Sequence, residues 1–223
     1  MIQISETAPG ALNNRLALLL SVVLHPLMLP TYILGTLFGI SPEAVGVSAL
    51  SSTARISLLF LLFLNTFVVP ALMIYTFYRL GLIQDLQLDS RRERRLPYLI
   101  TLILYSLSTY LFGWQFQPIS ELAPQIAVVL GSITVSLAVV TLVSLWWKIS
   151  AHATGMGGCL GAIGGVILRY GDFSLFFPLL ISIFITGLLL SARLRLNAHS
   201  PAQISAGLGV GLCISIAAVF LYF

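Results

Sequence analysis

The segment LAPQIAVVLGSITVSLAVVTLVSLWW, residues 122–147, decides the fold class of this chain. It contains no Asp, Glu, Lys or Arg. It also exceeds the roughly 20 apolar residues that an α-helix needs to cross the hydrocarbon core of a bilayer. Because lipid offers no hydrogen-bond partners, a spanning segment must satisfy its backbone groups internally, as a helix does. The segment therefore predicts a transmembrane helix.

The rest of the chain has the same apolar character. Hydrophobic residues make up 58% of the 223 residues, and the charged residues are 11 Lys and Arg and 7 Asp and Glu. Soluble domains carry about 25% charged residues, whereas this chain carries 8% and has a mean hydropathy of +1.03. That composition excludes a water-soluble globular monomer, and it excludes a disordered chain because such chains are polar and charged. We predict an all-α fold: one integral membrane domain over residues 1–223, a polytopic bundle of about six to seven transmembrane helices.

Seven apolar runs, separated by short polar segments, predict the individual spans. They cover residues 16–40, 56–78, 98–112, 122–147, 156–168, 175–190 and 204–223. Proline interrupts the first run at Pro26 and Pro30 and the second at Pro70, which membrane helices tolerate when neighbours satisfy the freed carbonyls. Glycines at positions 157, 161 and 165 of the fifth run lie on one helix face and predict close helix packing.

Seven spans place the two termini on opposite sides of the membrane, and the polar segments 79–97, 148–155 and 191–203 on the N-terminal side. Nine of the eleven basic residues fall on that side, and Arg55 and Arg169 are the exceptions. Positive charge retained in the cytoplasm would produce this bias, and so would residues that bind an anion; the two causes are compatible. The basic residues are too few and too scattered for a nucleic-acid-binding stripe, so we expect no nucleic acid partner.

The polar segments on the N-terminal side contain residue types suited to phosphate chemistry. Lys148, Ser150 and His152 offer an ammonium, a hydroxyl and an imidazole within five residues, and Arg193 precedes His199 by six. The planar guanidinium of arginine binds two phosphate oxygens at once, and imidazoles attack phosphorus or protonate a leaving oxygen. This pattern fits phosphoryl transfer at one face of the membrane. The alternative is an ordinary interfacial surface with extended arginines and helix-capping serines.

The third histidine and the two cysteines lie in apolar runs. His25 directly precedes Pro26, and we interpret it as a packing or backbone-bonding residue rather than a chemical one. Cys159 and Cys213 are too few for a disulfide framework or a cysteine-rich metal site.

Three short segments carry a recognisable pattern. Residues 94–97 read RRLP, residues 149–152 read ISAH, and Arg193 is followed six residues later by His199. In order and spacing they resemble the motifs of the type 2 phosphatidic acid phosphatase superfamily, which also includes bacterial acid phosphatases and vanadium haloperoxidases. Those motifs are a Lys followed six residues on by Arg-Pro, then Pro-Ser-Gly-His, then Ser-Arg, five residues, His, three residues and Asp. The resemblance covers residues 91–203, about half of the chain.

Two positions depart from the family pattern. No Lys stands at the family distance before Arg95; Arg91, one helical turn from Arg95, or Lys148 is the candidate replacement. Gln203 stands where the family has the Asp that orients and polarises the nucleophilic His. Gln accepts a hydrogen bond but adds no negative charge, and losing that charge in a Ser-His-Asp triad costs orders of magnitude in rate. The candidates for a substitute carboxylate are Asp85, Asp89 and Glu93.

The resemblance implies a metal-independent, cofactor-free lipid phosphatase in an integral membrane protein, as of the bacterial cytoplasmic membrane. His199 would form a phosphohistidine, His152 would protonate the leaving group and then activate water, and Gln203 would orient His199. The phosphate would be bound by nearby cationic and hydroxyl groups: Arg91, Arg94, Arg95, Lys148, Ser150 and Arg193. The expected partner is a membrane lipid substrate of the phosphatidic acid, phosphatidylglycerophosphate or polyprenyl diphosphate type.

Two other interpretations stay open. Gln203 and the missing Lys favour a catalytically weakened or inactive relative that binds anionic lipid. Asp85 and Asp89, four residues apart, faintly resemble the Asp-rich, magnesium-binding segments of prenyltransferases, although the chain has no second Asp cluster.

Overall fold

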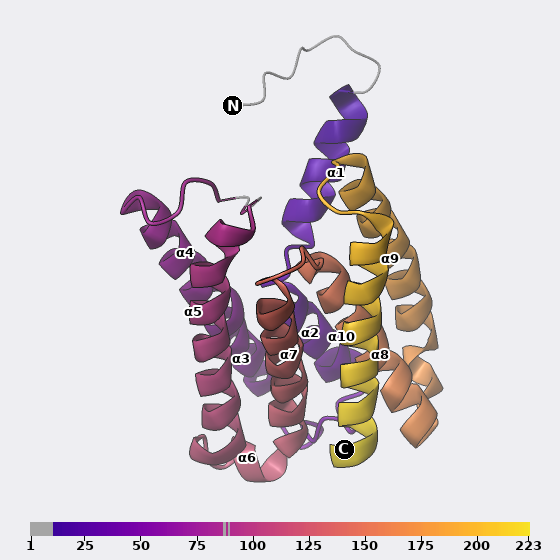
Figure 1. Ribbon diagram of the computed structural model, residues 1–223. Helices are drawn as coiled ribbons and strands as arrows, with labels where there is room; N and C mark the ends of the chain where they lie inside the picture. Colours follow the sequence, from indigo (N-terminus) through magenta and orange to yellow (C-terminus); the bar gives the residue numbers. More distant parts are fainter. Residues whose placement is uncertain (1–10, 87, 89) are drawn as a thin grey trace.

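The computed structural model describes residues 11–86, 88 and 90–223, with residues 11 and 12 described for the backbone only. Within these residues every regular element is a helix, and Figure 1 shows the helices gathered in one bundle. The α-helices are α1 (Ala11–Val23), α2 (Leu29–Ile40), α3 (Ser52–Phe63), α4 (Val69–Arg79), α5 (Arg91–Tyr110), α6 (Ile119–Leu122), α7 (Pro124–Val143), α8 (Ala151–Tyr170), α9 (Phe176–Arg195) and α10 (Pro201–Tyr222). Shorter helical turns are η1 (Leu64–Val68), η2 (Leu111–Gln115) and η3 (Phe173–Leu175).

Six helical segments are long and apolar enough to cross a membrane. They are Ser52–Arg79, Arg91–Gln115, Pro124–Val143, Ala151–Tyr170, Phe173–Arg195 and Pro201–Tyr222. Large apolar side chains remain exposed on them, such as Phe177 at 72% and Phe184 at 68% on α9. A bilayer would cover these side chains with lipid. The prediction of an all-α, polytopic membrane bundle is confirmed.

The first predicted span, residues 16–40, consists of two short helices, α1 of 13 residues and α2 of 12. The chain leaves the helical conformation before Pro26, because a residue that precedes proline avoids the α region. Pro30 lies in the first turn of α2, where its missing N–H leaves no bond unmade. At 1.5 Å per residue each helix is only about 20 Å long or less, shorter than the hydrocarbon core of ~30 Å. The break leaves His25 in irregular backbone between the two helices.

The second predicted span contains a wide helical turn beside its proline. The turn η1 lies between α3 and α4, and Pro70 occupies the first turn of α4. Pro70 has no N–H with which to bond a carbonyl of the preceding turn. The carbonyl of Thr66 in that turn accepts a hydrogen bond from the Tyr105 hydroxyl of α5 at 2.8 Å. A neighbouring helix thus satisfies backbone near the proline, as membrane burial requires.

Helices α8 and α10 approach closely through glycine. A Cβ atom at Gly157 would lie 2.2 Å from the Leu208 carbonyl oxygen, and one at Gly211 would lie 1.9 Å from the Thr154 carbonyl oxygen. A side chain at either position would push the two backbones apart. The prediction that glycines of the fifth apolar run pack against another helix is confirmed.

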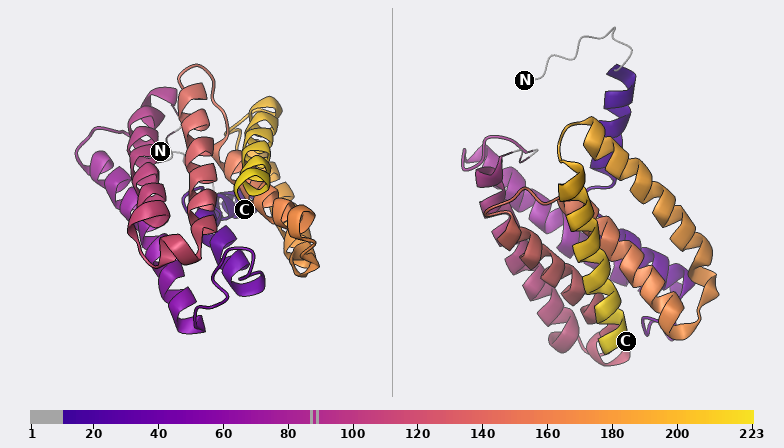
Figure 2. Two further views of the ribbon diagram at one scale, coloured as in Figure 1. Left: turned by 90° about the horizontal axis from the view of Figure 1, so that it is seen from below. Right: turned by 45° about the vertical axis from the view of Figure 1, so that its right-hand side comes forward.

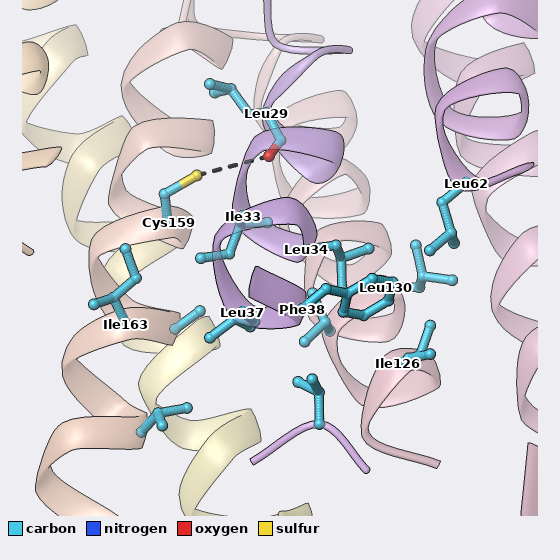
Figure 3. Close-up of a cluster of buried hydrophobic side chains, with 14 of the residues drawn as sticks. Leu29, Ile33, Leu34, Leu37, Phe38, Leu62, Ile126, Leu130, Cys159 and Ile163 are labelled. Atoms are coloured by element: carbon cyan, nitrogen blue, oxygen red, sulfur yellow. Dashed lines mark hydrogen bonds between the residues drawn. The ribbon is translucent and has the colours of Figure 1, made fainter. Parts of the chain in front are cut away.

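Helix α2 forms the centre of the apolar core. Its Leu34 and Leu37 are fully buried. Figure 3 shows α2 between α8, which carries Cys159, and α7, which carries Ile126 and Leu130. The apolar core therefore lies around α2, the helix that follows the break at His25. Polar residues lie toward the other end of the bundle.

The polar segments predicted on the N-terminal side lie toward one end of the bundle. In Figure 1 the first residues of α5, α8 and α10 and the last residues of α4, α7 and α9 all lie in the upper half of the view. The C-terminus lies at the lower end, away from α1, and the right-hand view in Figure 2 shows the same arrangement. The three motif segments thus approach one another in space.

Candidate functional site

Serine caps begin three helices at the upper end of the bundle. The hydroxyls of Ser90, Ser150 and Ser200 each accept an N–H of the first turn of α5, α8 and α10, respectively. Such caps satisfy N–H groups that a helix leaves unpaired at its start. Each of these helices therefore begins within a motif segment. Ser150, which the sequence suggests as a phosphate ligand, is fully buried in its capping position.

A partly open cavity of about 130 Å³ lies among these helix ends, and we call it the histidine cavity. Four residues suggested by the sequence line it: Arg94 of α5, His152 of α8, Arg193 of α9, and His199 of the connection between α9 and α10. These residues come from all three motif segments. The fold therefore joins segments that lie far apart along the chain into one site.

His199 is held at one ring nitrogen by two acceptors. Its Nδ1 atom lies 3.2 Å from the carbonyl oxygen of Lys148 and 3.2 Å from Oε1 of Gln203. Oε1 of Gln203 also accepts the backbone N–H of Ser200 at 3.1 Å, which identifies this atom as the amide oxygen. Since both partners accept, Nδ1 carries the proton of the neutral ring and Nε2 carries the lone pair.

The surroundings of His199 favour its neutral form. The pKa of His199, which lies outside the membrane-spanning segments, is lowered from 6.5 to about 4. Burial is the largest cause, and the positive charges of Arg94 and Arg193 lower the pKa further. The hydrogen bonds to Gln203 and to the Lys148 carbonyl oppose this shift but do not cancel it. At neutral pH His199 therefore keeps a nucleophilic lone pair on Nε2.

His152 is held through its other ring nitrogen, Nε2, whereas His199 is held through Nδ1. Its Nε2 atom lies 3.0 Å from the carbonyl oxygen of Ser21 in α1. A carbonyl only accepts, so Nε2 carries a proton and Nδ1 is the nitrogen at which His152 can release or take up another. The two histidines thus present different nitrogens for chemistry, Nε2 on His199 and Nδ1 on His152.

Two arginines supply the positive charge of the cavity. Arg94 is only 4% exposed, and it donates from Nε to the Leu88 carbonyl at 2.7 Å and from Nη1 to the Ile149 carbonyl at 3.5 Å. A guanidinium has five N–H groups, so Arg94 is fixed in place and still has donors for a ligand. Arg193 lines the cavity from the last turn of α9. Arg94 is buried and Arg193 is half-buried, and an anion is the ligand that two such guanidinium groups select.

The structure adds a residue that sequence reasoning placed in a packing role. His25 lines the histidine cavity, and its ring centroid lies 6.0 Å from that of His152 in an edge-on arrangement. Its Nδ1 accepts the backbone N–H of Leu27 at 3.3 Å, so the neutral ring has its proton on Nε2. A polar residue at membrane depth beside a proline was the signal that could have identified it. Tyr98 of α5 also lines the cavity, and no motif marks it.

Four suggested phosphate ligands do not line the histidine cavity: the capping residue Ser150, and Arg95, Arg91 and Lys148. Arg95 is exposed, because successive helical residues point about 100° apart and α5 turns Arg94 inward. Arg91 is exposed and donates to the Trp146 carbonyl. Lys148 contributes its carbonyl oxygen to His199, while its half-buried side chain is not part of the cavity lining.

The suggested carboxylates hold no position against His199 among the described residues. Glu93 accepts the N–H of Gln84 and the hydroxyl of Ser90, so it completes the start of α5. Asp85 is half-buried and does not line the cavity. Asp89, and with it the Asp85–Asp89 pair considered for magnesium, lies outside the described residues. Within residues 11–86, 88 and 90–223, no three His, Cys, Asp or Glu side chains are grouped as a metal site requires.

The histidine cavity therefore combines two guanidinium groups, a neutral imidazole with an available lone pair, and a second imidazole that can exchange a proton. Groups of these types are chemically able to bind an anion and to attack it. No protein-family model matches the chain, and comparisons with curated proteins and with solved structures give no match.

Proposed function

We propose that this protein is a membrane-embedded phosphatase that removes phosphate from a lipid phosphate or diphosphate. The observation that carries the proposal is the tautomer of His199. Its Nδ1–H is held by Gln203 and the Lys148 carbonyl, and its Nε2 lone pair is left for attack in a cavity that Arg94 and Arg193 also line. The spacing of the motif segments, which resembles the type 2 phosphatidic acid phosphatase superfamily, supports the same chemistry.

The proposed first step is attack of His199 Nε2 on phosphorus. The phosphorus–oxygen bond to the lipid alcohol, or to the leaving phosphate of a diphosphate, breaks as the nitrogen–phosphorus bond forms. His152, protonated on both nitrogens in the substrate complex, gives its Nδ1 proton to the departing oxygen and keeps the proton that its Nε2 donates to Ser21. Arg94 and Arg193 bind the non-bridging oxygens and stabilise their charge in the transition state.

The second step returns the protein to its starting state. His152, now neutral at Nδ1, takes a proton from a water molecule, and the resulting hydroxide attacks the phosphohistidine. The nitrogen–phosphorus bond breaks, inorganic phosphate leaves, and His199 regains its neutral form with the proton on Nδ1. The same imidazole serves as acid and then as base, as double displacement requires.

The substrate class follows from where the site lies. The histidine cavity is at one end of an apolar bundle, which suits a phosphate head group whose hydrocarbon part remains in the bilayer. Phosphatidic acid, phosphatidylglycerophosphate and polyprenyl diphosphates share this chemistry. We place the protein in the bacterial cytoplasmic membrane, and the nine-to-two distribution of basic residues between the two sides favours the cytoplasmic face for the site.

The test is phosphate release from lipid phosphates and diphosphates by the purified protein in mixed micelles or vesicles. We expect His199→Ala to abolish release and vanadate to inhibit it. Arg92→Ala is the matched control, since Arg92 is exposed in the first turn of α5, two residues from Arg94. Full activity of His199→Ala would refute the assignment.

The second candidate function is a non-hydrolytic relative that binds anionic lipid. It is favoured by Gln203, whose Oε1 belongs to the capping box of α10 and brings no negative charge to His199. Two substitutions separate the candidates. Gln203→Glu preserves the side-chain length and Gln203→Asp restores the family residue, and either should raise phosphate release from a weakened enzyme. Lipid binding without release from the wild type or from both variants would establish the binder.

A further inference from the structure

A second cavity, of about 80 Å³ and partly open, adjoins the histidine cavity, and we call it the chain cavity. It lies between α2, α5, α7 and α8, and α10 adds one lining residue, Ser215. Five residues line both cavities: Pro26, Leu27, Thr101, Leu137 and Ala151. The two spaces therefore lie next to each other and share these lining residues.

The walls of the chain cavity are chemically apolar even where they carry hydroxyl groups. No charged residue is among the described residues that line it. Six hydroxyl side chains line it, and five of them donate their protons to backbone carbonyls: Thr101 to Pro97, Tyr105 to Thr66, Ser132 to Val129, Ser136 to Ser132, and Thr154 to Ser150; the sixth is Ser215. The five donating hydroxyls have no proton left for a ligand. Apolar cavities exclude water and accept hydrocarbon.

The length of the chain cavity matches one leaflet of a bilayer. Its lining on α8 runs from Ala151 to Ala162, and its lining on α7 runs from Val140 to Val129. At 1.5 Å per residue each wall is about 16 Å long. That length is about half of the ~30 Å hydrocarbon core. The cavity thus has the depth of a hydrocarbon chain that begins at the membrane surface.

We infer that the chain cavity holds one hydrocarbon chain of the lipid phosphate whose phosphate group is bound in the histidine cavity. This inference rests on the proposed function and adds that the chain is enclosed by the bundle rather than left in the surrounding lipid. The charge at the mouth fits it, because Arg94 and Arg193 line the adjoining space and attract the phosphate. An amphiphile is the molecule that satisfies both cavities at once.

An enclosed chain makes turnover depend on chain length. Each methylene that enters the chain cavity leaves water or detergent and adds apolar contact, so binding strengthens until the far end is reached at Ala162 and Val129. A phosphate with a short chain fills only the mouth. Changes at the far end should therefore leave kcat/KM for the short substrate unchanged and should lower kcat/KM for the long substrate.

The first experiment fills the far end. Ala162→Phe adds a ring at the far end of the cavity on α8, and Val129→Phe on α7 is a second filling variant in case the first misfolds. We compare kcat/KM for hexyl and hexadecyl phosphate. In the filling variants we expect kcat/KM for hexadecyl phosphate to fall by about tenfold or more, the loss of a few buried methylenes, and kcat/KM for hexyl phosphate to stay near that of wild type.

The matched control is Gly164→Phe on the same helix, because a Cβ at Gly164 meets nothing within 4 Å and Gly164 does not line the cavity. It should leave the ratio of the two kcat/KM values unchanged. Equal loss of kcat/KM for both substrates in Ala162→Phe and Val129→Phe, or no loss for either substrate, would overturn the inference.

The second experiment does not need turnover, so it separates this inference from the proposed function. Hexadecyl phosphate with a diazirine at the end of its chain is photolysed with wild-type protein, and the labelled peptides are identified by mass spectrometry. Labels on α7 and α8 around Val129 and Ala162, lost in Ala162→Phe, support an enclosed chain. Labels confined to lipid-facing side chains such as Phe177 and Phe184 refute it. If no lipid phosphate is hydrolysed but this labelling is seen, the chain cavity stands and the proposed hydrolysis fails.

Discussion

His199 illustrates how much chemistry depends on the partners of one ring nitrogen. Gln203 and the Lys148 carbonyl both accept from Nδ1, which directs the lone pair of the neutral ring to Nε2. The sequence spacing suggested that Gln203 contacts His199, since residues four apart on a helix lie on one face. The second acceptor is a backbone oxygen from another segment, and no sequence motif announces a backbone contact of this kind.

The lowered pKa of His199 gives a pH prediction. Because its pKa is about 4 rather than 6.5, we expect His199 to remain neutral and nucleophilic throughout the range from pH 5 to pH 8. Protonation of Nε2 removes the lone pair, so loss of nucleophilicity belongs near pH 4. The folded state disfavours protonation, so the free energy of unfolding should decrease as pH falls from 6.5 toward 4.

The measurement is an NMR titration of protein labelled with 13C at histidine, assigned by comparison with His199→Gln. A midpoint for His199 at or above its ordinary value of 6.5 in the absence of ligand would contradict the prediction. Bound vanadate or phosphate should raise the midpoint, because a nearby negative charge favours the imidazolium.

His25 is expected to act as a hydrogen-bond donor to the bound anion. Its neutral ring carries the proton on Nε2, since Nδ1 accepts the Leu27 N–H. We expect His25→Gln to lower kcat/KM by roughly tenfold to a hundredfold, the range for one hydrogen bond to a charged group. The phosphohistidine should still form, whereas His199→Gln should abolish it. Acid-quenched labelling with a 32P-labelled substrate measures phosphohistidine formation in the two variants. A wild-type kcat/KM in His25→Gln would show that His25 does not bind the anion.

At the scale of the element, the sequence located most helices but not their breaks in detail. The six long helices lie where apolar runs predicted them, with ends that differ by several residues. The first run gave no indication of its division into α1 and α2 beyond its two prolines. That division matters because it places His25 beside His152. The break arises because the residue before Pro26 avoids the helical conformation, which is a local effect. The position of the break relative to α8 depends on how the helices pack.

The contact between α8 and α10 gives a prediction about stability. Gly157→Ala should lower the free energy of unfolding by more than about 1 kcal/mol, because the new Cβ would lie 2.2 Å from a backbone oxygen and the helices would have to separate. Gly164→Ala on the same helix is the control, since its Cβ meets nothing within 4 Å. It should be neutral or slightly stabilising, as alanine favours helix.

Denaturation by SDS in mixed micelles, followed by circular dichroism, compares the two variants with wild type. Equal stability of Gly157→Ala and Gly164→Ala would show that α8 and α10 do not pack as closely as described. The comparison isolates packing from helix propensity, because both changes replace glycine with alanine within one helix.

At the scale of the whole molecule, the main prediction concerns the side of the membrane on which each terminus lies. The broken pair α1 and α2 carries the chain from the upper to the lower end of the bundle in Figure 1, and six spans follow. We therefore expect the two termini to lie on opposite sides of the membrane. Reporter fusions at each terminus, one active in the cytoplasm and one outside it, measure this. Reporters on the same side would mean that α1 and α2 together do not cross.

The sequence by itself determined the fold class, because hydropathy is a sum over local residues and a charged fraction of 8% fits only a membrane environment. The sequence also predicted that the motif segments lie on one side of the membrane, because alternate loops between consecutive spans lie on the same side. Only the tertiary structure decided which residues of these segments line the histidine cavity. Helix rotation turned Arg94 inward and Arg95 outward, capping engaged Ser150, and packing brought His25 to His152. The chain cavity likewise exists only where four helices meet, since a space between side chains depends on relative positions that no local pattern encodes.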